Sequence, residues 1–248
     1  MMASETPRRS EKVMQNVRYV KVGGKEDAAT VVLERMRQEL EGGLRVLGLA
    51  TGSTMIPIYE AWAKSDLDFT DVTSFNLDEY VGLSADNPNS YAWFMNHHLF
   101  SHKPFKETYI PDGTADDLTA ECDEYEALLR DAEIDLQFLG VGENGHIAFN
   151  EPGTPFSSTT HLTELTDSTL GVNSQYFEDE SAIPNTALTM GIASILSSKK
   201  IILLAFGEKK RFALEQLLKG EATTDYPITA LLSHPDVTIV TDLEGITD

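Results

Sequence analysis

Short apolar runs alternate with helical patterns along almost the whole of this 248-residue chain. The runs that predict buried strands lie at residues 17–22, 44–49, 72–75, 134–139, 201–206 and 237–240. The patterns that predict helices lie at residues 25–41, from about 55, and at 90–99, 116–132, 184–196 and 209–219. Such alternation is typical of parallel βαβ units, whose crossover connections are helices. We therefore expect an α/β fold: a doubly wound, mainly parallel sheet with helices on both faces, Rossmann-like and in a single domain.

The domain is expected to span residues 17–248, which is enough chain to bury one full core. Residues 1–16 are polar and contain no apolar stretch, so we expect a flexible N-terminal extension rather than a signal peptide. Residues 154–182 are rich in Ser and Thr and show no strong periodicity. A segment of this length within a compact domain is often a binding loop, so we expect a lid there.

Composition restricts the partners of the chain. Its 19 Lys and Arg residues against 40 Asp and Glu residues give a formal charge of −21, and such a surface repels nucleic-acid phosphates. No apolar run approaches the length needed to cross a membrane. We therefore expect neither a nucleic-acid nor a membrane partner. Cys122 is the only cysteine, so no intrachain disulfide can form, and a reducing, cytoplasmic location is expected.

The most informative motif is the loop at residues 140–151, Gly-Val-Gly-Glu-Asn-Gly-His-Ile-Ala-Phe-Asn-Glu, which follows a predicted strand. Its three glycines spell G-x-G-x-x-G, but a dinucleotide-binding fingerprint must open a helix, and here a proline and a glycine follow directly. His146 could instead transfer protons near neutral pH if a neighbour such as Asn144 or Glu151 fixes its ring. The alternative is a purely structural histidine.

A second motif, Phe-Asn-Leu-Asp-Glu-Tyr-Val-Gly at residues 75–82, places two adjacent carboxylates just beyond the third predicted strand. Asp78 or Glu79 could act as a proton-transferring base if partial burial raised its pKa toward neutrality. The alternative is a solvated acidic loop, because carboxylates are mostly exposed and this chain contains many of them.

A third motif, Thr-Gly-Ser-Thr at residues 51–54, lies between a predicted buried strand and the start of a helix. Backbone N–H groups and small hydroxyls at a helix N-terminus bind anions, although a simple capping turn is the alternative. The motif lacks the lysine of a nucleoside triphosphate loop, so a sugar phosphate fits it better. Lys210, in a basic cluster after the strand at 201–206, could reach the same phosphate or could be a solvated charge.

All four of these sites follow the carboxyl ends of predicted strands, and parallel strands bring those ends to one edge of the sheet. We therefore expect them to form one active site. Other classes of site are not supported. His98 and His102 share a helical spacing but lack further zinc ligands in a suitable pattern, so no metal site is expected. The G-x-S-x-G elbow of many serine hydrolases does not occur.

Together these motifs resemble those of glucosamine-6-phosphate deaminases. The resemblance rests on Leu-Ala-Thr-Gly-Ser-Thr at 49–54, the motif at 75–82, the loop at 140–151 and Ala-Leu-Thr-Met-Gly at 187–191, and it extends from about residue 17 to residue 242. It implies conversion of glucosamine 6-phosphate and water to fructose 6-phosphate and ammonium in amino-sugar catabolism, without a cofactor or metal. The partner would be a small-molecule amino-sugar phosphate, and the protein would be a monomer or a homo-oligomer.

The resemblance also implies roles for individual residues. Asp78 would move a proton from C2 to C1 of the substrate during enolisation. His146 would open the pyranose ring by proton exchange at O1 and O5, with Asn144 and Glu151 orienting it. The phosphate would be held by Lys210 and by a loop of four residues, Thr51, Gly52, Ser53 and Thr54.

One departure from the family pattern bears on the substrate. Gln175, a further phosphate-site candidate, stands where the family usually has an arginine, and glutamine lacks the charged, bidentate guanidinium. Another amino-sugar phosphate, such as galactosamine 6-phosphate, is therefore one alternative. A 6-phosphogluconolactonase is a second, although it would not be expected to carry the motifs at 75–82 and 140–151 together. The non-enzymatic alternative, a sugar-phosphate-sensing module, would need a DNA-binding helix-turn-helix for which residues 1–16 have no room.

Overall fold

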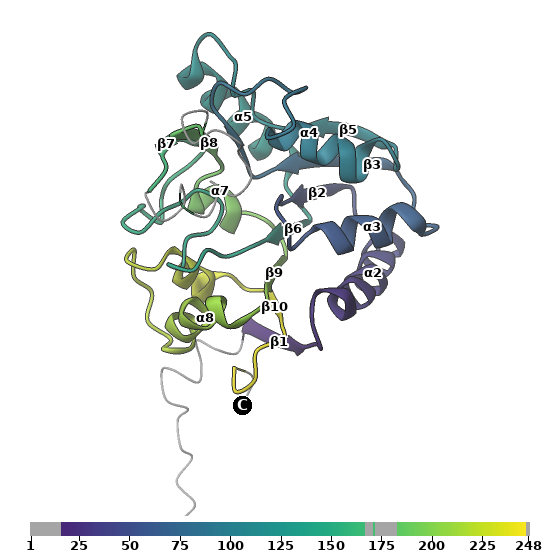
Figure 1. Ribbon diagram of the computed structural model, residues 1–248, viewed down its shortest axis with the longest axis vertical. Coiled ribbons are helices and arrows are strands. Elements are labelled where there is room, and N and C mark those ends of the chain that lie inside the picture. Colours follow the sequence, from purple (N-terminus) through teal and green to yellow (C-terminus); the bar gives the residue numbers. More distant parts are fainter. Residues whose placement is uncertain (1–15, 167–170, 172–182, 247–248) are drawn as a thin grey trace, which may run out of the picture.

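The computed structural model describes residues 16–166, 171 and 183–246. Its centre is a seven-stranded sheet in which every neighbouring pair of strands is parallel (Figure 1). In spatial order the strands are β1 (Val17–Lys21), β10 (Val237–Thr241), β9 (Ile201–Ala205), β6 (Leu136–Leu139), β2 (Val46–Leu49), β3 (Phe69–Asn76) and β5 (Phe105–Tyr109). The expected parallel sheet is confirmed.

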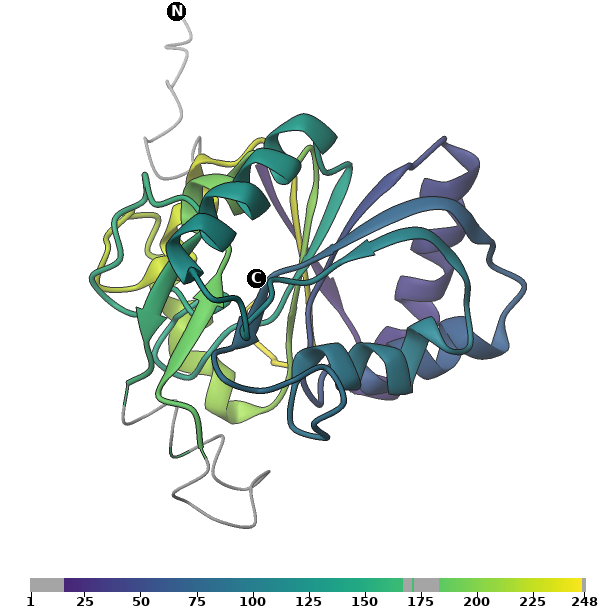
Figure 2. The ribbon, with the colours of Figure 1, turned by 90° about the horizontal axis from the view of Figure 1, so that it is seen from above.

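Helices cover both faces of this sheet. They are α2 (Lys25–Glu41), α3 (Ile56–Lys64), α4 (Tyr91–Met95), which continues as the π-helix η2 (Asn96–Phe100), α5 (Leu118–Ala132), α7 (Ile192–Leu196) and α8 (Arg211–Leu218), with the 3₁₀ turns η5 (Glu208–Lys210) and η6 (Pro227–Ser233). Seen from above, α2, α3 and α4 lie on one side of the sheet, and α5, α7 and α8 lie on the other (Figure 2). The expected doubly wound, single-domain arrangement is therefore confirmed.

The apolar pattern of the sequence explains why the sheet is buried between these layers. All five residues of β9, Ile-Ile-Leu-Leu-Ala, are buried, as expected for a parallel strand covered on both faces. Helix α2 buries one stripe that includes Ala28 and Val32 and presents its charged residues to solvent. On the same side, the Trp62 ring packs against Phe69 and Phe138 of the sheet with centroid distances of 5.5 Å. These contacts form a rigid support for the loops at the strand ends.

A second, smaller sheet begins just beyond the carboxyl end of β3. It contains β4 (Asp78–Tyr80), β8 (Thr186–Thr189) and β7 (His161–Glu164) in that order, and both pairings are antiparallel. Only Leu77 separates β3 from β4, and Asp78 is paired with Thr189. The Met190 N–H donates to the Leu77 carbonyl at 2.7 Å. The backbone on both sides of Asp78 is therefore held by hydrogen bonds.

The main difference between prediction and structure lies in this smaller sheet. The segment 184–196, expected to be one helix, begins with β8 and becomes helical only in α7. β8 pairs with a strand on each side, and these long-range pairings outweigh its local pattern. The segment expected to form a lid, 154–182, contains β7, while residues 167–170 and 172–182 lie outside the described residues. β5 was missed because its side chains are mostly exposed.

Some boundaries agree closely with expectation. Ser90 caps α4 as expected, because its Oγ accepts a hydrogen bond from the Trp93 N–H at 3.0 Å. The helix then changes to a π-helix at Asn96 instead of continuing as α-helix to residue 99. Of the extension expected at residues 1–16, only Asn16 is described.

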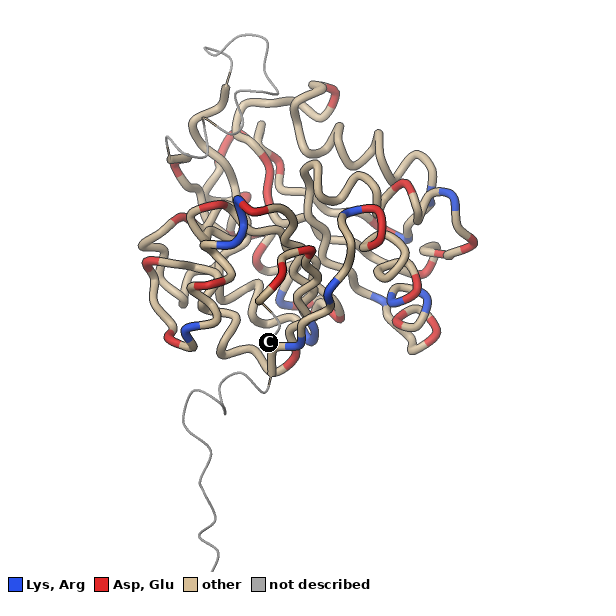
Figure 3. Tube along the Cα trace, turned by 60° about the horizontal axis from the view of Figure 1, so that its bottom comes forward, with Lys and Arg blue, Asp and Glu red and all other residues tan. Residues whose placement is uncertain are grey.

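Acidic residues outnumber basic residues in this protein. Asp and Glu positions are spread over both halves of the trace, and Lys and Arg positions are fewer (Figure 3). The surface presented to partners is therefore predominantly negative. Within the described ranges, no helix combines the length and apolar character that crossing a membrane requires.

Candidate active site

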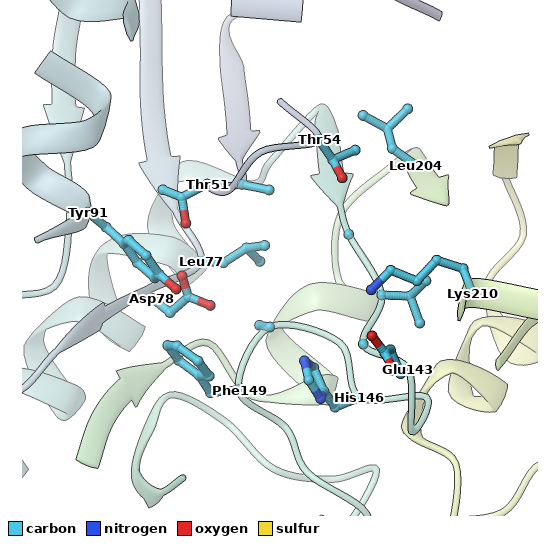
Figure 4. Close-up of a pocket in the computed structure, with 15 residues that line it drawn as sticks. Thr51, Thr54, Leu77, Asp78, Tyr91, Glu143, His146, Phe149, Leu204 and Lys210 are labelled. Atoms are coloured by element: carbon cyan, nitrogen blue, oxygen red, sulfur yellow. The ribbon is translucent and has the colours of Figure 1, made fainter. Parts of the chain in front are cut away.

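A cavity of about 200 Å³ lies at the carboxyl ends of β2, β3, β6 and β9. Five of the residues singled out from the sequence line it: Thr51, Thr54, Asp78, His146 and Lys210 (Figure 4). They come from segments that are far apart in the sequence, and the parallel topology brings these segments together. The structure therefore brings these five residues together around one cavity.

Asp78 is a buried carboxylate that faces this cavity, with its side chain drawn beside the Tyr91 ring in Figure 4. Burial raises the pKa of Asp78 to about 8, and the negative charge of Glu79 acts in the same direction. A carboxylate with such a pKa can take a proton from carbon and return it at near-neutral pH. Both acidic side chains are buried, so the alternative of a solvated acidic loop is wrong.

Glu79 has a different role from its neighbour. Its carboxylate accepts hydrogen bonds from the backbone N–H groups of Tyr80, Tyr91 and Ala92 at 2.8, 2.9 and 2.8 Å. Burial raises the pKa of Glu79, while these three hydrogen bonds act to lower it. Glu79 therefore joins β4 to the first turn of α4 and is an anchor rather than a reacting group.

The glycine-rich loop presents His146 to the cavity. The Gly142 N–H donates to the His146 carbonyl at 2.9 Å, and Gly145 has a positive φ of 87°, which favours glycine. A Cβ added at Gly142 would lie 2.2 Å from Cε1 of the His146 ring, so the ring can occupy this position only over glycine. The glycines thus set the turn and make space for the histidine.

Asn144 and Glu151 contact His146 but do not line the cavity. The His146 Nδ1 atom is 3.6 Å from Glu151 Oε2, and the Asn144 side-chain amide donates to the same oxygen at 2.9 Å. The Asn144 side-chain carbonyl accepts from the His146 backbone N–H at 3.1 Å. Thr166 donates to the other Glu151 oxygen at 3.1 Å. Glu151 therefore lies next to the ring, whereas Asn144 contacts Glu151 and the His146 backbone.

The third motif forms the turn between β2 and α3. Gly52 has a positive φ of 95°, and its carbonyl accepts from the Met55 N–H at 3.0 Å. Thr51 and Thr54 line the cavity, whereas Gly52 and Ser53 do not. The Ser53 hydroxyl instead accepts a long hydrogen bond of 3.5 Å from Lys25. Only two of the four loop residues therefore present side chains to a ligand.

Lys210 enters the cavity from η5, on the side opposite Asp78 in Figure 4. Burial lowers the pKa of this half-buried amine, and the carboxylate of Glu143 acts to raise it. Glu143 also forms an ion pair with Lys209 at 3.3 Å. Gln175, the remaining phosphate-site candidate, lies outside the described residues.

Sequence reasoning missed several residues of the cavity lining, including Tyr91, Glu143 and Phe149. Glu143 and Phe149 lie within the glycine-rich loop, so their nearness to the site was readable from that loop. Tyr91 gave no such signal, because it follows the Ser90 cap and lies in no motif that was singled out. Its position depends on long-range contacts.

No group of three or more His, Cys, Asp or Glu side chains is arranged to hold a metal ion in the part of the chain that the structure describes. His98 packs on the Phe94 ring at 4.4 Å, and His102 is hydrogen-bonded through Nε2 to the His97 carbonyl at 3.1 Å. Both histidines lie outside the cavity lining. His98 thus packs along its own helix, and His102 lies exposed in the turn that follows it.

The fold and the site define an α/β enzyme in which a buried carboxyl of raised pKa, a histidine and a lysine line one cavity. Residues 25–240 match the model of the glucosamine-6-phosphate isomerase/6-phosphogluconolactonase family. The chain belongs to this family.

Individual relatives agree with this assignment. A glucosamine-6-phosphate deaminase of Lactobacillus acidophilus is 52% identical over 209 residues, which cover 84% of this chain and 87% of the relative. A solved monomeric glucosamine-6-phosphate deaminase is 42% identical with a TM-score of 0.88, covering 93% of this chain and 98% of that one. A 6-phosphogluconolactonase of Thermotoga maritima, 21% identical with a TM-score of 0.72 over 91% of this chain and 97% of its own, shares the fold.

Proposed function

We propose that this chain is a glucosamine-6-phosphate deaminase, which converts glucosamine 6-phosphate and water to fructose 6-phosphate and ammonium. The observation that carries the proposal is the buried Asp78, whose pKa is raised to about 8, in the same cavity as His146 and Lys210. Relatives that are 52% and 42% identical over most of the chain bear the name of this activity and support it.

Ring opening is the first step of the proposed reaction. His146 takes the proton from the O1 hydroxyl and delivers a proton to O5 as the C1–O5 bond breaks, which leaves an open-chain aldehyde. Glu151, 3.6 Å from Nδ1, supports the positive charge that the ring carries in between, and Asn144 holds Glu151 in place.

Enolisation and release of ammonia follow. Asp78 removes the proton from C2, and the carbonyl oxygen at C1 takes up a proton from solvent, so that an enolamine forms. Asp78 then returns its proton to C1, which gives an imine at C2. Water adds to this imine, the C–N bond breaks, and ammonium leaves with fructose 6-phosphate as the second product. The steps are proton transfers, the addition of water to the imine and the loss of ammonium, with no net oxidation or reduction, so the proposed reaction needs neither a cofactor nor a metal.

The phosphate group is proposed to lie at the end of the cavity that Lys210 and the Thr51–Thr54 loop form. The supporting observations are the Lys210 amine and the Thr51 and Thr54 side chains, which line the cavity, with Thr54 on the side of Lys210 in Figure 4. A dianionic phosphate is well matched by one cation and several short hydrogen-bond donors. With glutamine at position 175, Lys210 carries much of the electrostatic attraction.

Two other activities make different predictions for the purified chain. A deaminase for another amino sugar would release ammonium from galactosamine or mannosamine 6-phosphate in preference to the glucosamine compound. A 6-phosphogluconolactonase would hydrolyse the lactone and release no ammonium. The likeness to solved lactonases shows only a common fold, and lactone hydrolysis does not require a base for a carbon-bound proton.

The test is to incubate the chain with each of the three amino-sugar phosphates and with 6-phosphogluconolactone. Ammonium, ketose phosphate and lactone hydrolysis are measured in parallel, with Asp78→Asn as the control. We expect equal amounts of ammonium and fructose 6-phosphate from glucosamine 6-phosphate. Hydrolysis of the lactone without ammonium release, or tight binding of the amino sugars without turnover, would refute the proposal.

We further propose that the protein is a cytoplasmic monomer and that residues 154–182 act as a lid, with residues 1–16 as a flexible extension. The solved deaminase that is 42% identical is described as monomeric, which supports the first point. Light scattering on the purified chain tests the oligomeric state. Proteolysis with and without substrate tests the lid, because a closing segment becomes protected on binding.

A further inference from the structure

Lys25 is a half-buried lysine that forms no ion pair with any residue that the structure describes. It is the first residue of α2 and follows the carboxyl end of β1, so it lies at the same edge of the large sheet as the cavity. The chain carries 40 acidic residues against 19 basic ones, so acids for pairing are plentiful. Withdrawing a cation from water is unfavourable unless an opposite charge replaces the water, and an unpaired Lys25 is therefore available to an anionic ligand.

The amine of Lys25 contacts the loop at residues 51–54. It donates to the Ser53 hydroxyl at 3.5 Å, which is its one hydrogen bond within the described ranges. A bond of this length is weak, and an ammonium group has three N–H donors, so most of its capacity is unused. Ser53 is adjacent to Thr54, whose side chain lines the cavity on the side of Lys210 in Figure 4. Lys25 thus approaches the Lys210 end of the cavity from just outside its lining.

Lys210 is the second cation at this end, and it too forms no ion pair within the part of the chain that the structure describes. The nearby carboxylate of Glu143 forms its ion pair with Lys209 instead, at 3.3 Å. Burial lowers the pKa of Lys210, and the positive charges of Lys209 and Lys25 lower it further, which agrees with the contact of Lys25 with the adjoining loop. Gathering like charges is unfavourable unless an anion lies between them, so this local excess of positive charge in an acidic protein indicates an anion site.

We propose that Lys25 is a second phosphate-binding cation, which holds the phosphate group from the Ser53 side while Lys210 holds it from the side of η5. The inference rests on the proposed function for the identity of the sugar that carries the phosphate. The competing role for Lys25 is structural, as a tie between α2 and Ser53. The two roles differ in their response to salt, because salt screens the attraction between separate charges but leaves a local tie in the fold largely unchanged.

The experiment measures the Kd of inorganic phosphate by calorimetry, together with KM and kcat for ammonium release from glucosamine 6-phosphate. In Lys25→Met, which keeps the length of the side chain and removes its charge, we expect the phosphate Kd and KM to rise about three- to tenfold, with kcat within about twofold of wild type. Lys25→Arg keeps the charge, so its phosphate Kd should stay within about twofold of wild type. The matched control is Lys106→Met, which removes the same charge from an exposed position of β5, at the opposite edge of the sheet from β1. We expect this control to bind phosphate as the wild type does.

The same titrations at about 0.5 M salt decide between the two roles of Lys25. We expect the ratio of the phosphate Kd of Lys25→Met to that of wild type to shrink there, because the screening length becomes short. The proposal would be overturned by a wild-type chain that does not bind phosphate, by a wild-type phosphate Kd in Lys25→Met, by an equal rise in Lys106→Met, or by a rise that salt does not reduce. If Lys25→Met weakens phosphate binding as expected but the wild-type chain releases no ammonium, the proposed function is wrong and the anion site stands.

Discussion

Asp78 and Glu79 are adjacent on strand β4, yet their carboxylates lie in different surroundings. Glu79 accepts three backbone N–H groups and anchors α4, whereas the Asp78 side chain lines the cavity. The alternation of side chains along a strand produces this division, because neighbouring residues point to opposite faces. One acid of the pair is therefore held by backbone hydrogen bonds, and the other faces the cavity.

The first prediction concerns the base. Asp78→Asn keeps the shape of the side chain but removes its ability to accept a proton, so kcat should fall by about 10²- to 10⁴-fold. Binding of fructose 6-phosphate, measured by calorimetry, should persist within a few-fold. A purified variant with near-normal turnover would exclude Asp78 as the base.

The second prediction concerns the pH dependence of the reaction. The pKa of Asp78 is raised to about 8, and the base must be ionised to act, so kcat/KM should rise with pH and level off above about 8. The measurement is a pH profile of kcat/KM between about pH 6 and 9.5. A kcat/KM that does not change with pH below about 8 would show that burial does not raise the pKa of Asp78.

The third prediction concerns stability. In the unfolded chain Asp78 has an ordinary pKa near 4, so between about pH 4 and 8 the folded state binds more protons and wild-type stability falls as pH rises. Asp78→Asn removes this dependence. We expect its Tm advantage over wild type to grow from about pH 5.5 to 8 and then to stay constant. The control is Asp123→Asn, at an exposed position of α5, whose Tm difference from wild type should not change with pH in this way.

The fourth prediction concerns ring opening. His146→Gln removes the group that exchanges protons at O1 and O5, so turnover of the cyclic substrate should fall by about 10²-fold or more. An open-chain analogue should be affected far less. Glu151→Gln should lower turnover of the cyclic substrate less than His146→Gln does, and again more than turnover of the open-chain analogue. The reason is that Glu151 acts through His146, at 3.6 Å, rather than on the substrate. Equal losses with cyclic and open-chain compounds would contradict this role.

The fifth prediction concerns the charges at the phosphate end. Lys210→Ala should raise KM by about 10- to 100-fold, since it removes a charged hydrogen bond. Glu143→Gln should lower KM, by up to about fivefold, because its carboxylate faces Lys210 and opposes an incoming phosphate. The decrease in KM caused by Glu143→Gln should be smaller at high salt, because salt screens the repulsion between this carboxylate and the phosphate. An unchanged or raised KM for Glu143→Gln would show that this carboxylate does not oppose phosphate binding.

Much of the fold and the site could be predicted from the sequence because the signals are local. The run at 201–206 is apolar throughout and became the fully buried β9, and the pattern at 25–41 matches α2 to the residue. The motifs at strand ends identified Asp78, His146 and Lys210 as neighbours because a parallel sheet gathers those ends at one edge. The sequence alone therefore determined the layer architecture and most of the charged and titratable groups that line the cavity.

Only the tertiary structure decided what depends on contacts between distant segments. Thr186–Thr189 forms a strand because β4 and β7 pair with it, and no periodicity within four residues can indicate such partners. Tyr91 lies at the cavity in contact with Tyr80 and Phe149, neither of which its own surroundings in the sequence suggest. The pKa of Asp78 likewise depends on burial, and burial is a property of everything that packs around a residue. The type of each residue can be read from the sequence, but its partners, its burial and its pKa depend on how distant segments pack around it.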